Sequence, residues 1–140
     1  MSSIKIYKAK SIKDYIFLRE VRNQNREFLT ENINYITTFD QIFFYLFQSR
    51  RYRIYIVEKK GQKAGYILLK QSKNIYFITE IILKKFRRQN LGTQMVNFAK
   101  KKYKKLIAKI SLRNKISITF HKKLGFEEIK RDKKMLYLRL

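Results

Sequence analysis

The stretch KKFRRQNLGTQM, residues 84–95, lies where an apolar run ends and an amphipathic segment begins. The chain has only 4 glycines and no proline, yet one of those glycines, Gly92, falls here. A strand-to-helix turn has a use for such a residue. So does an anion-binding loop, in which backbone N–H groups at a helix N-terminus face a phosphate. The surrounding sequence must distinguish these two interpretations.

Composition narrows the class of protein. The length of 140 residues is enough for one domain with a core of its own, and we expect a single domain over residues 1–140. A hydrophobic content of 45% argues against disorder, and the lack of cysteine excludes disulfides and thiolate metal sites, so no metal is expected. No apolar run approaches the roughly 18 residues that span a bilayer, and the N-terminus does not resemble a signal peptide. We therefore expect a cytoplasmic protein.

The formal net charge of +24 predicts attraction to polyanions such as nucleic acid, acidic membranes or phosphorylated small molecules. The lysines, however, are spread along the whole chain rather than gathered in one tract. A genome-wide preference for A/T-rich codons would also produce this excess of Lys, Ile and Asn. Both interpretations, a solvated basic surface and a surface for an anionic ligand, stay open.

Hydrophobic periodicity predicts the order β-α-α-β-β-β-α-β-α-β-β, which is typical of an α+β domain with a mixed sheet. Expected helices begin after Ser11, at Thr38 or Asp40, at Leu91 and at Lys115, and Gly125 is expected to end the last of them. The face of the third helix is expected to reach Leu106, which also begins an expected strand. The expected strands cover 3–9, 52–58, 64–70, 74–83, 106–112 and a C-terminal hairpin that turns at 132–133.

In this order, the opening stretch joins a buried strand to a helix. The N–H groups from Arg88 to Thr93 are expected to point outward at the positive end of that helix, beside the charges of Arg87 and Arg88. Gly92 leaves space for a ligand, and Asn90 is of the non-glycine type that most readily adopts a left-handed conformation. Many strand-to-helix junctions share these features.

A second segment makes the signal more specific. Together with residues 110–129, ISLRNKISITFHKKLGFEEI, the loop resembles the GNAT superfamily of acyl-CoA-dependent N-acyltransferases. The family motif R/Q-x-x-G-x-G/A aligns with residues 87–92. A second motif, an asparagine, a small residue and then aromatic-x-x-x-Gly-Phe, aligns with Asn114, Ser117 and residues 121–126. The resemblance implies a mostly antiparallel mixed sheet of about seven strands flanked by about four helices.

The resemblance also implies that the protein binds acetyl-CoA and releases CoA. The loop would hold the pyrophosphate, the backbone at the end of the fourth strand would pair with the pantetheine arm, and two residues after the fifth strand would lie beside that arm. These residues are Arg87, Arg88, Gln89, Asn90, Leu91, Gly92 and Thr93 in the loop, Ile81, Ile82 and Leu83 in the strand, and Asn114 and Ser117. Asn90 departs from the family glycine, and its Cβ crowds the phosphate unless the left-handed conformation is held.

Two residues are candidates for catalysis. His121 stands where the family usually has the tyrosine that protonates the departing thiolate, and an imidazolium with an ordinary pKa of about 6.5 can also give up that proton. The alternative is a solvent-facing histidine, with the thiolate protonated by water. Glu80 interrupts an apolar run and is the expected base, because burial would raise its pKa. Its alternatives are pairing with a lysine or exposure to solvent, and Glu58 and Asp40 are weaker candidates.

The acceptor is indicated only by residues 18–46. This segment is similar to a branch that acts on nucleotide-linked amino sugars or on ribosomal-protein N-termini, and the match is carried by Arg22, Asn23, Ile36, Thr37, Phe43 and Phe44. Of these, Arg22, Asn23, Phe43 and Phe44 are the expected substrate residues. Arg22 is equally explained as a cation at a helix C-terminus.

Three functions remain open from the sequence. The first is transfer of an acetyl group to a small anionic amine, such as an amino-sugar nucleotide, by direct attack in a ternary complex. The second is transfer to a macromolecular acceptor, either an aminoacyl-tRNA or a ribosomal protein. The third is a non-catalytic basic module that binds nucleic acid or CoA. A monomer and a homodimer are both compatible with the sequence.

Overall fold

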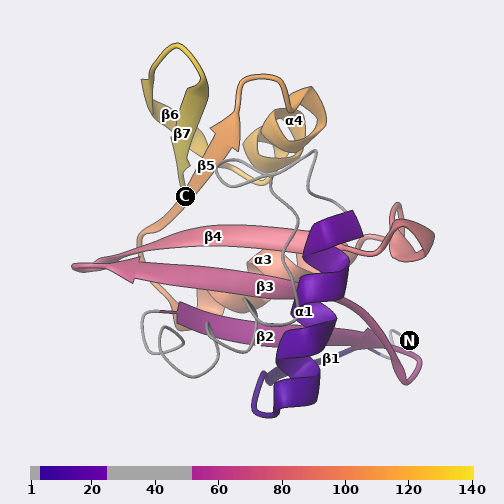
Figure 1. Ribbon diagram of the computed structural model, residues 1–140. Helices are drawn as coiled ribbons and strands as arrows, with labels where there is room; N and C mark the ends of the chain where they lie inside the picture. The colour runs from indigo at the N-terminus through magenta and orange to yellow at the C-terminus, as the bar shows by residue number, and fades with distance from the viewer. Residues whose placement is uncertain (1–3, 25–51) are drawn as a thin grey trace.

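The computed structural model describes residues 4–24 and 52–140 (Figure 1). The expected second helix, residues 38–49, lies outside them. The elements in chain order are β1 (Ile4–Lys8), α1 (Ile12–Gln24), β2 (Tyr52–Lys59), β3 (Gln62–Ser72), β4 (Ile75–Ile82), the 3₁₀ turn η3 (Lys84–Phe86), α3 (Leu91–Lys102), β5 (Leu106–Ser111), α4 (Lys115–Lys123), β6 (Glu127–Arg131) and β7 (Met135–Arg139).

The strands form one seven-stranded sheet in the order β1-β2-β3-β4-β5-β7-β6, so the prediction of a mixed, mostly antiparallel sheet is confirmed. Among the described strands, only β4 and β5 pair in parallel, and their pairing covers only Tyr76–Leu106 and Phe77–Ile107. Beyond Phe77, β4 pairs with β3 alone, up to Ile82. In Figure 1, β5, β6 and β7 accordingly diverge from the flatter part of the sheet. One edge of β4 is therefore left without a described strand beside it.

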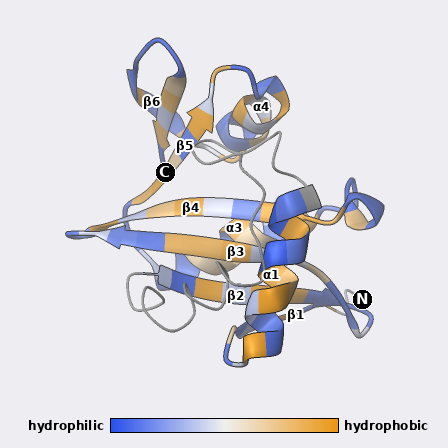
Figure 2. Ribbon diagram, viewed as in Figure 1, coloured by the Kyte–Doolittle hydropathy of each residue, from blue (hydrophilic) through white to orange (hydrophobic). Residues whose placement is uncertain are grey.

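Two apolar layers cover the sheet. Because side chains alternate along a strand, Ile54 and Ile56 of β2 pack with α1, while Tyr55 and Val57 belong to the cluster that contains α3. Helix α1 lies across the sheet in the foreground and α3 lies behind it, and Figure 2 shows the apolar strands between these helices. Val21, on the predicted apolar face of α1, is completely buried.

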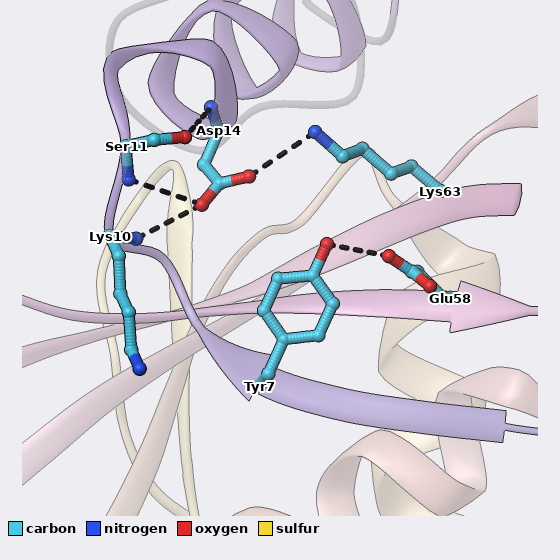
Figure 3. Close-up of polar contacts among 6 residues, drawn as sticks. All are labelled: Tyr7, Lys10, Ser11, Asp14, Glu58 and Lys63. Atoms are coloured by element: carbon cyan, nitrogen blue, oxygen red, sulfur yellow. Dashed lines mark hydrogen bonds and ion pairs between the residues drawn. The ribbon is translucent and has the colours of Figure 1, made fainter. Parts of the chain in front are cut away.

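A reciprocal cap begins α1. The Ser11 hydroxyl accepts a hydrogen bond from the Asp14 N–H, and an Asp14 carboxylate oxygen accepts from the N–H groups of Lys10 and Ser11 (Figure 3). The other Asp14 oxygen lies 3.2 Å from Lys63 Nζ on β3. Burial opposes the charge of Asp14, but these contacts outweigh it and lower its pKa. The predicted cap at Ser11 is confirmed, and it ties α1 to the sheet.

The structure corrects the extent of the third predicted helix. Helix α3 ends at Lys102, and Leu106 belongs to β5, where it pairs with Tyr76. The chain leaves the helix because Tyr103 is extended and Lys105 adopts a φ of 59°. The predicted end of the following helix is confirmed, since Gly125 has a φ of 99°, a conformation that favours glycine after a helix.

Candidate active site

The loop between β4 and α3 has, at Asn90, the backbone conformation expected from the sequence. Asn90 is the N-cap of α3 with φ 65° and ψ 16°, so the predicted left-handed conformation is confirmed, and Arg88 is also left-handed at φ 61°. The Asn90 side chain makes no cap hydrogen bond. The first N–H groups of a helix have no partner within the helix. The start of α3 therefore presents amides that its own N-cap side chain does not satisfy.

Two side chains of this loop bind the protein itself. Arg87 Nε donates to the Ile82 carbonyl at 3.3 Å. Gln89 donates to the Lys85 carbonyl at 3.3 Å and accepts from Lys59 Nζ at 2.5 Å. Arg88, by contrast, is exposed. Arg87 and Gln89, two of the side chains in the predicted phosphate loop, therefore hold the loop in place. Arg88 is the cation of that predicted set that faces solvent.

Gly92 has a neighbour that the sequence did not reveal. A Cβ built on Gly92 would lie 2.9 Å from Cζ of Phe120 on α4. The space expected to admit a ligand is therefore filled on this side by an aromatic ring. The glycine lets α4 pack against the first turn of α3, which places the two helices of the site relative to each other.

The end of β4 offers only part of the predicted edge. The Leu83 N–H donates to the Ala64 carbonyl at 2.8 Å, so this amide is used by the neighbouring strand. Ile81 packs in the cluster with α1. The Ile82 carbonyl faces away from β3, where it accepts the bond from Arg87. Of the three predicted residues, Ile82 is the one whose carbonyl the structure places at the edge toward β5.

The two predicted residues that follow β5 lie at the beginning of α4. Asn114 is its N-cap, and its side-chain oxygen accepts from the Ser117 N–H at 3.1 Å. The Ser117 carbonyl in turn lies 2.7 Å from Nδ1 of His121. Asn114 and Ser117 therefore begin the helix and orient the ring of His121.

The structure brings the two predicted catalytic residues together. Nε2 of His121 lies 2.8 Å from Oε1 of Glu80, and the two side chains are only 5% and 6% exposed. Neither side chain faces solvent, and no described lysine forms an ion pair with Glu80, so the alternatives of an exposed histidine and of an exposed or lysine-paired glutamate are wrong. The pair links β4 to α4 across the region where β4 and β5 have separated.

The protonation of His121 follows from its contacts. A carbonyl oxygen can only accept, so the 2.7 Å contact with the Ser117 carbonyl requires the hydrogen on Nδ1. Phe120 and Phe126 meet the ring at 83° and 87° and exclude water. This burial disfavours the charged ring, but the negative charge of Glu80, its contact with Nε2 and the Ser117 carbonyl outweigh it and raise the pKa of His121.

Two atoms of the pair have unused hydrogen-bonding capacity. Oε2 of Glu80 is buried and has no hydrogen-bond partner among the described residues. Nε2 of His121 has no hydrogen-bond partner in this part of the chain beyond its 2.8 Å contact with Oε1. Buried polar atoms without partners are costly and uncommon. The buried Oε2 of Glu80, without a partner among the described residues, is available to accept a proton.

The remaining predicted residues are only partly placed. Arg22 and Asn23 lie in the last turn of α1, where both are half-buried. Burial lowers the pKa of Arg22, and the neighbouring Tyr66 opposes that shift. Phe43, Phe44 and Asp40 lie outside the described residues. Glu58, the other weaker candidate base, accepts a 2.7 Å hydrogen bond from the Tyr7 hydroxyl (Figure 3).

Comparison with known proteins shows the family of this chain. Residues 50–128, more than half of the chain, match the family model described as an acetyltransferase (GNAT) domain. No curated protein matches the sequence. Within the described residues, no helix has the length and apolarity needed to cross a membrane.

Several solved structures share the fold. A putative acetyltransferase from Salmonella typhimurium, solved with acetyl-CoA, has a TM-score of 0.77 at 17% identity, covering 99% of this chain and 93% of that one. A spermidine N-acetyltransferase from Vibrio cholerae, in complex with CoA and spermine, has a TM-score of 0.83 at 14% identity, with coverages of 99% and 95%. A ribosomal-protein-alanine N-acetyltransferase from Brucella melitensis has a TM-score of 0.76 at 18% identity, with coverages of 97% and 98%. By its family match and its fold, this chain belongs to the GNAT acetyltransferases, the enzymes that use acetyl-CoA to acetylate amines.

Proposed function

We propose that the protein acetylates the primary amine of a small anionic acceptor, such as an amino-sugar nucleotide, by direct attack in a ternary complex with acetyl-CoA. The observation that carries the chemistry is the buried contact between Glu80 and His121, at 2.8 Å. The net charge of +24 supports an anionic acceptor. We infer that the chain acts as one domain, residues 1–140, in the cytoplasm.

The residues present fit acetyl-CoA. Arg88 and Asn90 are left-handed, and the side chain of Asn90, the N-cap of α3, does not bind the first amides of the helix. This arrangement is suited to a diphosphate. The edge of β4 at Ile82, where β5 has diverged, is suited to an amide-containing arm. We propose that residues 88–93 hold the diphosphate and that this edge holds pantetheine. When bound, acetyl-CoA supplies the activated acetyl thioester.

Glu80 and His121 have complementary roles in this proposal. Glu80, through its unpartnered Oε2, takes a proton from the amine. His121, whose pKa is raised by the charge of Glu80 against the opposing effect of burial, gives its Nε2 proton to the departing thiolate. The aromatic rings around His121 keep water from competing for these protons.

The test of the acceptor is thiol release from acetyl-CoA with a panel of amines. We expect the highest kcat/KM for an amine that carries a diphosphate, and an increase of its KM with ionic strength, because salt screens the attraction between opposite charges. Spermidine, which is a polycation, should be a poor substrate of so basic a protein. A preference for spermidine, or a KM that does not respond to salt, would exclude the anionic acceptor.

His121→Ala should lower kcat by about 10- to 100-fold, because the thiolate then takes its proton from water. Thr119→Ala, an exposed position on the same helix, is the matched control and should leave kcat unchanged. Steady-state kinetics of both variants provide the measurement. An unchanged kcat in His121→Ala would remove this residue from the mechanism.

One observation favours a second candidate, a macromolecular acceptor that contains RNA. Seven exposed lysines surround the end of the sheet where β3 turns into β4 and α3 connects to β5, and no described residue forms an ion pair with any of them. These are Lys70, Lys73, Lys100, Lys101, Lys102, Lys104 and Lys105. The pairing of Tyr76 with Leu106 brings the two connections together.

A salt titration of tRNA binding separates the two candidates. If the lysines contact phosphates, the slope of log K against log salt should decrease in magnitude by about 2 to 3 in Lys100→Gln/Lys101→Gln/Lys104→Gln, because each lost contact removes about 0.7 to 0.9. The control triple Lys8→Gln/Lys10→Gln/Lys13→Gln removes as much charge from exposed positions elsewhere. If the two triple variants changed the salt slope equally, the net charge of the protein, and not a defined lysine surface, would account for tRNA binding.

A further inference from the structure

The contact between Glu80 and His121 determines which ring nitrogen can exchange a proton and with which group. The ring hydrogen on Nδ1 is fixed by the Ser117 carbonyl, so only Nε2 can exchange a proton. This nitrogen lies 2.8 Å from a carboxylate oxygen of Glu80. When both residues are charged, this contact holds one proton, and Glu80 is then already a base while His121 is already an acid.

In so buried a site, an isolated carboxylate would tend to be protonated and an isolated imidazole would tend to be neutral. The base and the acid would then not both be in their active forms at the same pH. Burial disfavours both a lone carboxylate and a lone imidazolium. Among the described residues that contact the ring, Glu80 is the only charged one. The others are Phe120, Phe126 and Ser117, from α4 and the segment that follows it. Each charge of the pair is therefore stabilised by the other, and by no other charged group in contact with the ring.

We propose that Glu80 and His121 form one proton-exchanging dyad, in which the Ser117 carbonyl fixes the tautomer of the ring and the proton that Glu80 takes from the amine returns to His121. This proposal rests on the proposed function and adds to it that the acid and the base are interdependent. The Ser117 carbonyl and Glu80 act here as positioning groups for the ring as well.

The protons balance without a contribution from solvent. A C–N bond forms and the C–S bond breaks, and the sulfur leaves with the electron pair of that bond. The amine loses one proton to Oε2 of Glu80, and the sulfur receives one proton from Nε2 of His121. The carboxyl group then turns about its Cγ–Cδ bond, a torsion that is soft in side chains of this type, and passes its proton to Nε2. The dyad returns to its initial charges.

The test uses the protein without any ligand. Because His121 is the only histidine in the chain, ring ¹⁵N chemical shifts give its tautomer and pKa without ambiguity. In the wild type we expect the hydrogen on Nδ1 in the neutral form and a pKa above the ordinary 6.5. In Glu80→Gln the pKa should fall below that of the wild type, because burial then acts without the opposing charge. Ser117→Ala keeps the carbonyl and should keep the tautomer.

Glu128→Gln is the matched control, because it removes the same charge from an exposed pair with Arg131 and should leave the pKa of His121 unchanged. A wild-type pKa below 6.5, or a hydrogen on Nε2 in the neutral form, would overturn the dyad, and this result needs no variant to fold. So would a pKa that Glu80→Gln does not lower. If these titrations agree with the dyad but no amine is acetylated, the proposed function fails while the pairing stands.

Kinetics then test the interdependence. If the two residues act as one unit, the double variant Glu80→Gln/His121→Ala should have the kcat of Glu80→Gln alone, within about threefold, because residues that act together are not additive. Independent roles would instead multiply the two losses, giving a further decrease of about 10- to 100-fold. The second result would overturn the dyad while leaving both residues in the mechanism.

Discussion

Replacing Glu80 by glutamine is expected to lower kcat by about 10²- to 10⁴-fold, the range typical of a lost general base. Glutamine has nearly the shape of glutamate, so the side chain should still fill its buried position between β4 and α4. It cannot accept a proton from the amine. It also removes the charge that raises the pKa of His121, so a smaller fraction of the ring is protonated at a given pH.

The pH dependence gives this prediction a second readout. In the wild type, kcat should remain high above pH 6.5 because the raised pKa keeps His121 protonated there, and it should fall as the pH rises through that pKa. In Glu80→Gln this alkaline limb should move to lower pH. Glu58→Gln, which alters a carboxylate bonded to Tyr7, is the control and should retain both the rate and the profile. A rate within threefold of wild type in Glu80→Gln would mean that another group is the base.

Gly65→Ala should be the most destabilising single-methyl substitution among the four glycines. A Cβ at this position would lie 2.2 Å from the Ile81 carbonyl oxygen and 3.0 Å from the Ile82 Cα, both of which are backbone atoms that cannot rotate away. Accommodating it requires β3 and β4 to separate where they are paired, Gly65 being opposite Ile82. Overpacking of this kind costs about 1–3 kcal/mol, and we expect the upper end or more.

Two other glycines are suitable controls for denaturant unfolding. Gly61 has open space around it and a φ of 79°, so Gly61→Ala should cost only the strain of a left-handed residue, about 1–2 kcal/mol. Gly92→Ala meets only the flexible end of Phe120. If Gly65→Ala lost no more stability than Gly61→Ala, the close approach of β3 and β4 at this point would be refuted. A variant that does not fold at all would agree with the prediction.

Features set by near neighbours in the chain were predictable. Ser11 and Asp14 are three residues apart and cap α1 wherever that helix lies, and Gly125 ends α4 by a conformation that its own backbone allows. Asn90 likewise has a side chain that tolerates the left-handed conformation. The extent of α3 was not predictable in the same way. Leu106 fits the helical period, but its pairing with Tyr76 on β4 outweighs that preference.

The sequence by itself determined the order of the described elements, the left-handed loop before α3 and the residue types that we propose for acetyl transfer, because these depend on local conformation and on side-chain chemistry. Only the tertiary structure decided that Glu80 and His121 touch, that Phe120 occupies the space beside Gly92, and that Gly65 must have no side chain. Each of these is a contact between elements distant in the chain. Its distance is set by how β4 diverges from β5 and how α4 packs on α3, which no local pattern encodes.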